Sequence, residues 1–294
     1  IYESESDFLF GRDPSDCFVV PPRNFGSGCS LYPRPKAWDA VSIPHAKKSV
    51  PIQIGTDFFC KLLFTKIKFI IMAKHIVKII QAFYITHDVK CFIVEKPEGF
   101  DFIPGQSVNI SINLPEWKDQ LRAFNITSLR EREFLEFMIK IYPEHNGVTK
   151  MLGKINAGGE LILHDVFGAI IYSEPGIFIA AGTGITPFIS IFRDLYKKRK
   201  IEGNGLIYTC KTQDDVIMDQ ELKKLLKKNY LKHFTRENVI GFRENHIDRK
   251  FLIENISNFG QHFYICGPSE FVEHISKYLL DLGATANTLV IEDK

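Results

Sequence analysis

An apolar run breaks into two glycines at residues 176–187, where the chain reads Gly-Ile-Phe-Ile-Ala-Ala-Gly-Thr-Gly-Ile-Thr-Pro. This pattern predicts a strand, a tight turn and a helix, because Pro187 suits the first helical turn, where a missing N–H costs no hydrogen bond. The free amides of Gly184 to Thr186 would then point outward with the positive end of the helix dipole, and glycine at Gly182 and Gly184 leaves room for a pyrophosphate. The motif predicts a phosphate site, with an ordinary strand-to-helix connection as the alternative.

A second group of candidate residues lies in an extended stretch at 121–128. Alternation along a strand places Arg122 and Phe124 on one face and Asn125 on the other. A guanidinium can bind a pyrophosphate through two hydrogen bonds, and an aromatic ring can stack on a flat heterocycle. The alternative is a surface arginine beside a core phenylalanine.

Two shorter motifs add possible binding groups. Gly147-Val148-Thr149 begins a helical pattern with a hydroxyl near its N-terminus, which makes it a second possible anion site. Cys266 ends an apolar run and precedes Gly267-Pro268 and another helical pattern, so its sulfur would lie near the start of a helix. A plain buried cysteine is the alternative at that position.

Strands and helices alternate in the second half of the chain, which predicts a parallel sheet with right-handed crossovers. Ligands of such sheets bind at the carboxyl ends of the strands, and both 182–184 and 266–268 fall at such ends, so we expect these two motifs to face one cleft. The expected helices are 185–200, 219–228, about 249–255 and 270–282, and the expected strands after the glycine turn are 205–211, 230–235, 261–266 and 288–291.

The first half of the chain, from residue 75, consists of short segments rich in β-branched and aromatic residues, separated by turn signals. Such a series followed by an alternating α/β region predicts a small antiparallel barrel joined to an α/β domain. The expected strands are 75–86, 89–95, 106–112, 121–128 and 134–142.

Composition excludes several classes of protein. The chain has 294 residues, 45% hydrophobic content and a formal net charge of +2, which suits a globular protein of two domains and gives no reason to expect nucleic acid or a membrane as partner. The apolar stretch 58–71 is too short for a membrane span and contains three lysines. The six cysteines form no CxxC pair and the histidines no HxxH spacing, so no metal site is predicted. The cysteines also indicate no disulfide framework, which favours the reducing cytoplasm. We expect the protein to be a monomer.

Residues 1–71 differ from the remainder, since they hold seven of the fourteen prolines and show no regular apolar period. The first methionine is Met72, so we expect an irregular leader at 1–71 outside the folded core, with a small extra domain as the alternative. The expected domains are then 72–172 and 173–294.

Five motifs follow one another along the chain: Phe-Ile-Pro-Gly-Gln at 102–106, Arg-Ala-Phe-Asn at 122–125, Gly-Val-Thr at 147–149, the glycine turn at 182–187 and Cys-Gly-Pro at 266–268. Their order resembles the ferredoxin–NADP reductase superfamily, and more narrowly the bacterial flavodoxin/ferredoxin reductases with an FAD-binding domain. The resemblance covers roughly residues 73 to 292. It implies an antiparallel six-stranded flavin-binding barrel followed by a parallel-sheet nucleotide-binding domain.

The resemblance implies FAD and NAD(P)H as cofactors and assigns residue roles. Arg122 would contact the FAD pyrophosphate, Phe124 would lie beside the flavin ring, and Asn125 stands where the family has Ser or Thr near flavin N5. Lys294 replaces the aromatic residue often found at the end of family members. The implied catalytic residues are Cys266, Asn125 and Glu292, and the implied cofactor-binding residues are Arg122, Ala123, Phe124, Asn125, Gly147, Val148, Thr149, Gly182, Thr183, Gly184, Thr186, Lys211, Cys266, Gly267 and Pro268.

The implied reaction passes a hydride from NAD(P)H to bound FAD and then single electrons to an acceptor protein, flavodoxin or ferredoxin. Asn125 and Lys294 keep open a second hypothesis, a flavin-binding sensor or subunit without catalysis. Within enzymes, the reductase component of an oxygenase or of a ferric-iron system is the rival. The choice between NADH and NADPH depends on the end of the strand 205–211, where Lys211 is followed by Asp214 and Asp215 and the sequence leaves both open.

Overall fold

The computed structural model describes residues 74–168, 170–236 and 246–292, all of which belong to one unit of the chain. The expectations about residues 1–71 and Lys294 lie outside the described residues. None of the helices in these ranges is long and apolar enough to span a membrane.

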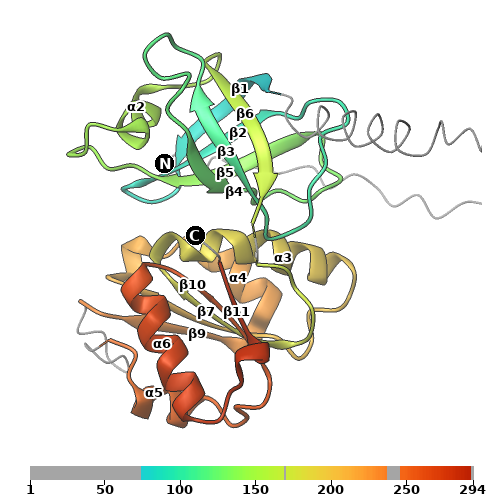
Figure 1. Ribbon diagram of the computed structural model, residues 1–294, viewed down its shortest axis with the longest axis vertical. Coiled ribbons are helices and arrows are strands. Elements are labelled where there is room, and N and C mark those ends of the chain that lie inside the picture. Colours follow the sequence, from blue (N-terminus) through green and yellow to red (C-terminus); the bar gives the residue numbers. More distant parts are fainter. Residues whose placement is uncertain (1–73, 169, 237–245, 293–294) are drawn as a thin grey trace, which may run out of the picture. The chain divides into compact units, whose positions relative to one another are not determined.

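The first domain, here called the barrel domain, is an antiparallel sheet of six strands in the order β4-β3-β6-β1-β2-β5, with the helix α2 (Figure 1). After β4, the N–H of Thr127 donates to the carbonyl of Glu136 in β5, so the two outer strands meet. This confirms the expected fold class. The elements are β1 (His75–Tyr84), β2 (Val89–Glu95), β3 (Ser107–Ile112), β4 (Arg122–Asn125), β5 (Phe134–Lys140), α2 (Val148–Lys154) and β6 (Glu160–Phe167).

Strand β6 is the one that the apolar pattern did not predict. Its apolar residues are followed by His164 and Asp165, which break the run that would have marked a strand. In the sheet, β6 pairs with both β1 and β3, and the ring nitrogen Nε2 of His164 lies 2.9 Å from Oγ of Ser111 on β3. A hydrogen bond to the neighbouring strand therefore lets a polar residue lie inside the strand.

A buried lysine anchors α2 to the sheet. Lys90 on β2 is 2% exposed, and its Nζ donates to the carbonyls of Gly153 and Ile155 at 3.1 and 2.7 Å and to Oδ1 of Asn156 at 3.1 Å. These carbonyls belong to the end of the helix, where a cation also faces the negative end of the helix dipole. Lys90 thereby fixes the helix that follows the Gly147 motif.

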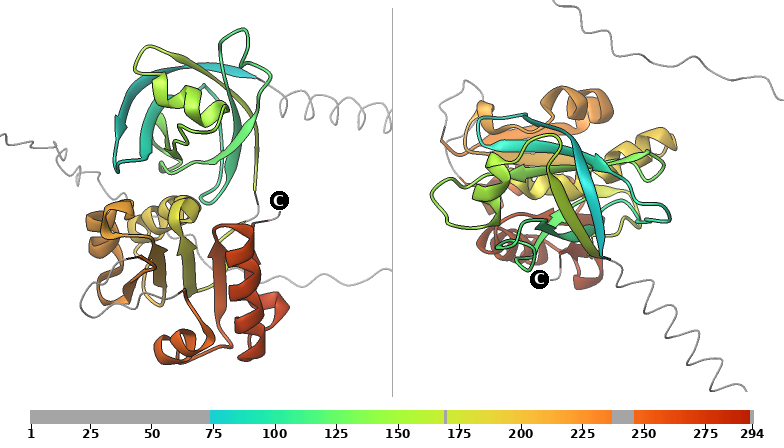
Figure 2. Two further views of the ribbon diagram at one scale, coloured as in Figure 1. Left: turned by 90° about the vertical axis from the view of Figure 1, so that its left-hand side faces the viewer. Right: turned by 90° about the horizontal axis from the view of Figure 1, so that it is seen from above.

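The second domain, here called the sheet domain, has five parallel strands in the order β11-β10-β7-β8-β9. Helices α3 and α4 cover one face and α5 and α6 the other (Figures 1 and 2). The elements are β7 (Gly176–Ala181), η1 (Gly182–Ile185), α3 (Thr186–Lys197), β8 (Gly205–Cys210), η2 (Gln213–Asp215), α4 (Asp219–Leu226), η3 (Lys227–Asn229), β9 (Tyr230–Phe234), α5 (Arg249–Asn255), β10 (His262–Cys266), α6 (Ser269–Asp281), η4 (Ala286–Thr288) and β11 (Leu289–Ile291).

Alternation along the strands of the sheet domain divides its core into two clusters. Phe178 and Tyr264 face α3 and α4, where their stacked rings lie 4.3 Å apart, while Ile179 and Phe263 face α5 and α6. Strands buried on both faces read as continuous apolar runs, which is why the sequence predicted the inner strands β8 and β10 within one residue. The two strand ends that carry the glycine turn and Cys266 therefore rest on a packed, rigid sheet.

The expected helices at 185–200 and 219–228 are both shorter in the structure. α3 ends at Lys197, two residues before Arg199 with φ of +56°, and α4 ends at Leu226, before Lys227 with φ of +53°. A left-handed residue cannot continue a right-handed helix. Lysine-rich runs fit helices well, so nothing in their composition marked these ends.

Candidate functional site

The glycine turn at the start of α3 uses its two glycines for different purposes. Gly182 has φ of +54°, and a Cβ atom built on it would meet no atom within 4 Å. A Cβ on Gly184 would lie 2.3 Å from the carbonyl oxygen of Cys266, so the backbone at the end of β10 leaves room only for glycine there. Gly182 is thus the position that leaves open space for a ligand beside the backbone.

The expectation of outward amides from Gly184 to Thr186 is wrong in one respect. The turn is a 3₁₀ helix, and the N–H of Thr186 donates to the carbonyl of Thr183 within it. A 3₁₀ turn closes its hydrogen bonds one residue earlier than an α-helix, so it leaves fewer unpaired amides. An anion at this turn would therefore bind to the amides that precede Thr186.

The hydroxyl of the buried Tyr208 stabilises the same turn. The hydroxyl of Tyr208 on β8 donates to the carbonyl of Gly182 at 3.0 Å. Complete burial raises the pKa of Tyr208 well above its ordinary value, so the hydroxyl remains protonated and able to donate. The left-handed turn at Gly182 is held by this bond.

The structure brings the glycine turn and the Cys266 motif together. β7 and β10 are parallel neighbours, with Cys266 opposite Ala180, so their carboxyl ends lie at one edge of the sheet (Figure 1). A Cβ on Gly267 would lie 2.9 Å from Cβ of Ala181. The two motifs that the sequence placed at strand ends are in direct contact.

A chain of hydrogen bonds gathers the three residues that the resemblance implied as catalytic. Oγ1 of Thr186 donates to Oδ1 of Asn125 at 3.0 Å, and Nδ2 of Asn125 donates to Oγ of Ser107 at 2.7 Å. Oγ of Ser107 lies 3.4 Å from one oxygen of Glu292, and Sγ of Cys266 lies 3.9 Å from the other. The chain joins the barrel domain to the glycine turn and to the end of the sheet domain.

Ser107 is a member of this chain that the sequence did not reveal. It is 1% exposed and lies directly opposite Asn125 in the pairing of β3 with β4. Its position just after the Pro-Gly-Gln motif at 104–106 is the signal that could have identified it, since that motif leads into β3 beside the expected binding strand. The partnership itself depends on strand register, which the sequence alone does not specify.

On the barrel side, Arg122 is exposed, and its Nη1 donates to the carbonyl of Leu121 at 2.7 Å. Phe124 is half-buried and packs against the barrel core, and Ala123 between them is exposed. An exposed guanidinium next to a half-buried ring fits a pyrophosphate and a flat ring, and it fits the structural alternative as well.

The Gly147 motif spans the start of α2, whose N-terminus has no side-chain cap. Gly147 is the N-cap residue without a side-chain cap, and a Cβ there would meet no atom within 4 Å. Val148 is buried and Thr149 half-buried, so the motif is fixed on one side and open on the other. An uncapped helix N-terminus with open space beside it can accept an anion.

Two exposed basic residues, Lys211 and Arg236, lie at the end of β8, where the resemblance implies the choice between NADH and NADPH. Lys211 is exposed directly after β8, and its carbonyl accepts the N–H of Arg236, which is also exposed. Oδ2 of Asp215 accepts the N–H and the hydroxyl of Thr212 at 2.8 and 2.6 Å. Asp215 is therefore already used in capping the turn η2.

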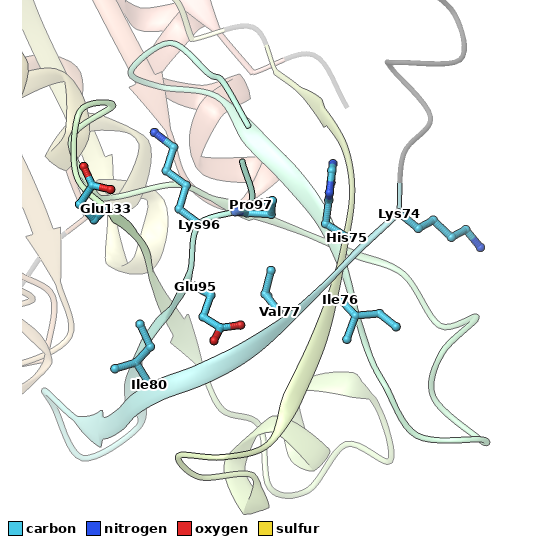
Figure 3. A pocket seen from close by; sticks show the side chains of 9 residues that line it. All are labelled: Lys74, His75, Ile76, Val77, Ile80, Glu95, Lys96, Pro97 and Glu133. Carbon is cyan, nitrogen blue, oxygen red and sulfur yellow. The ribbon is translucent and has the colours of Figure 1, made fainter. Parts of the chain in front are cut away.

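A pocket of about 560 Å³ lies away from these groups, on the outer side of β1. None of its lining residues is among those that the resemblance implied, and its mixture of lysines and glutamates does not offer the apolar walls of a flavin site. Figure 3 shows the lining of this pocket, which consists of Lys74, His75, Ile76, Val77, Ile80, Glu95, Lys96, Pro97 and Glu133.

One cluster of possible metal ligands occurs among the described residues, formed by His87, Asp88 and Asp215 with ligand atoms within 4.8 Å of one another. Nζ of Lys140 lies 2.5 Å from Oδ2 of Asp88. The ammonium group already neutralises this carboxylate, so the cluster is explained as an ion pair.

Comparison with known proteins gives two family matches. Residues 76–172 match the oxidoreductase FAD-binding domain, and residues 178–277 match the oxidoreductase NAD-binding domain. The order and extent of the two matches agree with the barrel domain and the sheet domain. These matches identify the barrel domain as an FAD-binding domain and the sheet domain as an NAD(P)-binding domain.

The curated relatives are distant, and several of them are NADH-cytochrome b5 reductases. NADH-cytochrome b5 reductase 1 of Aspergillus terreus is 27% identical over 161 residues, which is 49% of this chain and 54% of that protein. The anthranilate 1,2-dioxygenase electron transfer component of Acinetobacter baylyi is 25% identical over 211 residues, 66% of this chain and 58% of that protein. The chain spans about half the length of the first curated relatives it matches.

Solved structures agree with the fold. A ferredoxin NADP+ reductase from Neisseria gonorrhoeae with bound FAD and NADP superposes with a TM-score of 0.66 at 20% identity, over 74% of this chain and 97% of that chain. The FAD/NAD-binding domain of nitric oxide dioxygenase from Vibrio cholerae also gives 0.66, at 21% identity, over 74% and 96%. With an FAD-binding barrel followed by an NAD-binding sheet domain, the chain belongs to the ferredoxin–NADP reductase-like superfamily.

Proposed function

We propose that this chain is a flavoprotein reductase that takes electrons from NAD(P)H into bound FAD and delivers them singly to an acceptor protein. The observation that carries the proposal is the hydrogen-bonded chain from Thr186 through Asn125 and Ser107 to Glu292. It connects the expected flavin-binding strand with the expected nicotinamide loop, and Cys266 lies beside its end. Two cofactors that exchange a hydride need such an alignment of their binding sites.

FAD supplies the conversion between two-electron and one-electron chemistry when it is bound. The protein's own residues hold and align it. Arg122 and the open Gly147 motif would bind the pyrophosphate, and Phe124 would lie beside the ring. The turn at Gly182 would bind the pyrophosphate of the nicotinamide nucleotide, with Cys266 next to the nicotinamide. We further propose the domain boundary at residues 172/173.

Asn125 has both ends of its amide engaged, because Oδ1 accepts from Thr186 and Nδ2 donates to Ser107. This supports a defined orientation for the residue, with one hydrogen of Nδ2 left to donate toward the flavin. It also favours the second candidate, a flavin-binding sensor or subunit without catalysis. An amide held on both sides cannot reorient as a hydroxyl can.

The acceptor that we propose is flavodoxin or ferredoxin, in line with the ferredoxin NADP+ reductase among the similar structures. The electron transfer component of a dioxygenase among the relatives supports the oxygenase alternative. Both alternatives need a one-electron centre on another protein. Reduction assays with each purified acceptor distinguish them, and the acceptor reduced fastest at equal concentration identifies the partner.

The full chain, purified aerobically, tests the main proposal. We expect a yellow protein whose flavin absorbance is bleached anaerobically by NADH or NADPH. A colourless protein that also fails to take up added FAD would refute the flavin site. A yellow protein that neither nucleotide bleaches would favour the sensor. The nucleotide that bleaches the flavin at the lower concentration decides between NADH and NADPH, the choice that depends on the region of Lys211.

A further inference from the structure

One face of α3 carries a row of contacts to the barrel domain. The four residues that make them are separated by four, three and four positions, which is the spacing of a single helix face. The contacts are Thr186 with Asn125, Ser190 with Gly105, Arg193 with Thr127 and Glu136, and Lys197 with Glu131.

Of the two charged residues in this row, Arg193 makes the more buried contact. Its side chain is 15% exposed, and Nη1 donates to the carbonyl of Thr127 at 2.8 Å and to Oε1 of Glu136 at 2.5 Å. Nε and Nη2 donate to the two oxygens of Glu221 on α4 at 2.6 and 2.8 Å. One guanidinium thus joins β5 of the barrel domain to two helices of the sheet domain.

The two carboxylates have distinct roles around this cation. Burial opposes the charge of Arg193, but Glu221 and Glu136 outweigh it and raise its pKa, so the cation persists. Glu221 binds in a bidentate fork from the same domain, which fixes the plane of the guanidinium. Glu136 is the partner across the domains, and it is 15% exposed, where a charge pair is screened little by solvent.

Arg193 lies seven residues after Thr186 on the same helix, about 10 Å along its axis. A short helix moves as a rigid rod, so the position of Arg193 determines the position of Thr186 and of the glycine turn before it. We propose that Arg193 is a positioning residue, whose ion pair with Glu136 holds the glycine turn in register with the barrel domain for hydride transfer. This inference rests on the proposed reductase function.

Glu136→Gln is the variant that tests the inference. Arg193→Met would leave the half-buried carboxylates of Glu136 and Glu221 without their cation and endanger folding. Glu136→Gln removes only the charge of Glu136 and keeps its shape and an oxygen for the hydroxyl of Thr127. At saturating NAD(P)H we expect the rate of anaerobic flavin bleaching to fall about tenfold, because small misplacements of reacting groups are costly. FAD content and the nucleotide concentration for half-maximal rate should stay within about twofold, since neither binding site includes Glu136.

Glu131→Gln is the matched control. Glu131 pairs with Lys197 on the same helix face, but the side chains are 44% and 56% exposed, and such surface pairs contribute little. We expect its bleaching rate to stay within about twofold of the wild type. Equal rates for Glu136→Gln and wild type would overturn the inference, as would equal slowing by both variants or loss of FAD from Glu136→Gln. A wild-type protein that is not bleached would instead overturn the proposed function, and the inference with it.

Discussion

Replacing Gly184 with alanine tests the contact between the glycine turn and the end of β10. The new Cβ would lie 2.3 Å from the carbonyl oxygen of Cys266 and 2.8 Å from the amide nitrogen of Gly267. Both are backbone atoms at the end of β10, so neither can rotate away as a side chain could. An ordinary contact requires a shift of about 1 Å in one of two paired segments.

Overpacking in a dense interior costs roughly 1–3 kcal/mol in the free energy of unfolding, and a clash with backbone belongs at the upper end of that range. For a folded part of roughly 200 residues, 1 kcal/mol changes Tm by about 2–4 °C, so we expect a decrease of about 6–12 °C. Gly182→Ala is the matched control. Its Cβ would meet nothing within 4 Å, and only the left-handed backbone, with φ of +54°, costs about 1–2 kcal/mol.

Thermal unfolding of the two full-length variants and the wild type, followed by circular dichroism with excess FAD, measures both effects. The order of Tm should be wild type, Gly182→Ala and then Gly184→Ala. If Gly184→Ala unfolds at the wild-type temperature, or no earlier than Gly182→Ala, the close approach of Cys266 to the turn is refuted. Anaerobic bleaching of the same samples shows how far the displaced turn still accepts a nucleotide.

Three other substitutions test separate parts of the site. Arg122→Ala should weaken FAD retention, with Arg122→Lys between it and the wild type because a lysine lacks the bidentate fork; unchanged FAD content after gel filtration would remove the pyrophosphate role. Ser107→Ala removes the hydroxyl between Asn125 and Glu292 and should slow the bleaching of the flavin while FAD content stays the same. An unaltered bleaching rate would show that this series of hydrogen bonds is not needed to align the cofactors. Lys90→Met leaves the carbonyls of Gly153 and Ile155 without their donor and should lower the free energy of unfolding in urea by about 2–4 kcal/mol; a loss below about 1 kcal/mol would contradict this anchoring of α2.

Much of the fold follows from local pattern. The inner strands β7, β8 and β10 of the sheet domain are largely buried on both faces, so they read as apolar runs between helical segments, and the structure confirms them. Strand β6 was missed because His164 interrupts its pattern, and the hydrogen bond with Ser111 that permits this residue depends on a partner 53 positions away. Only the resemblance, which implies a sixth strand, corrected for it.

The site could be predicted in part for the same reason. Residues within motifs, such as Asn125 and Cys266, could be proposed from their neighbours in the sequence. Ser107 and Arg193 were not, because their roles depend on contacts with Glu292 and Glu136, 185 and 57 positions away. Gly184 was found for an incomplete reason, since the group that excludes a side chain there is the carbonyl of Cys266.

The contact row on α3 has a consequence for recombination between relatives. A chimera that joins this barrel to the nucleotide domain of another family member would inherit Glu136 and Asn125 without any guarantee of a matching arginine and threonine seven residues apart. Such a hybrid could fold as two sound halves, retain both cofactors and still transfer electrons slowly. If Arg193 positions the glycine turn, an exchange of the sheet domain has to include its counterpart residues on β4 and β5.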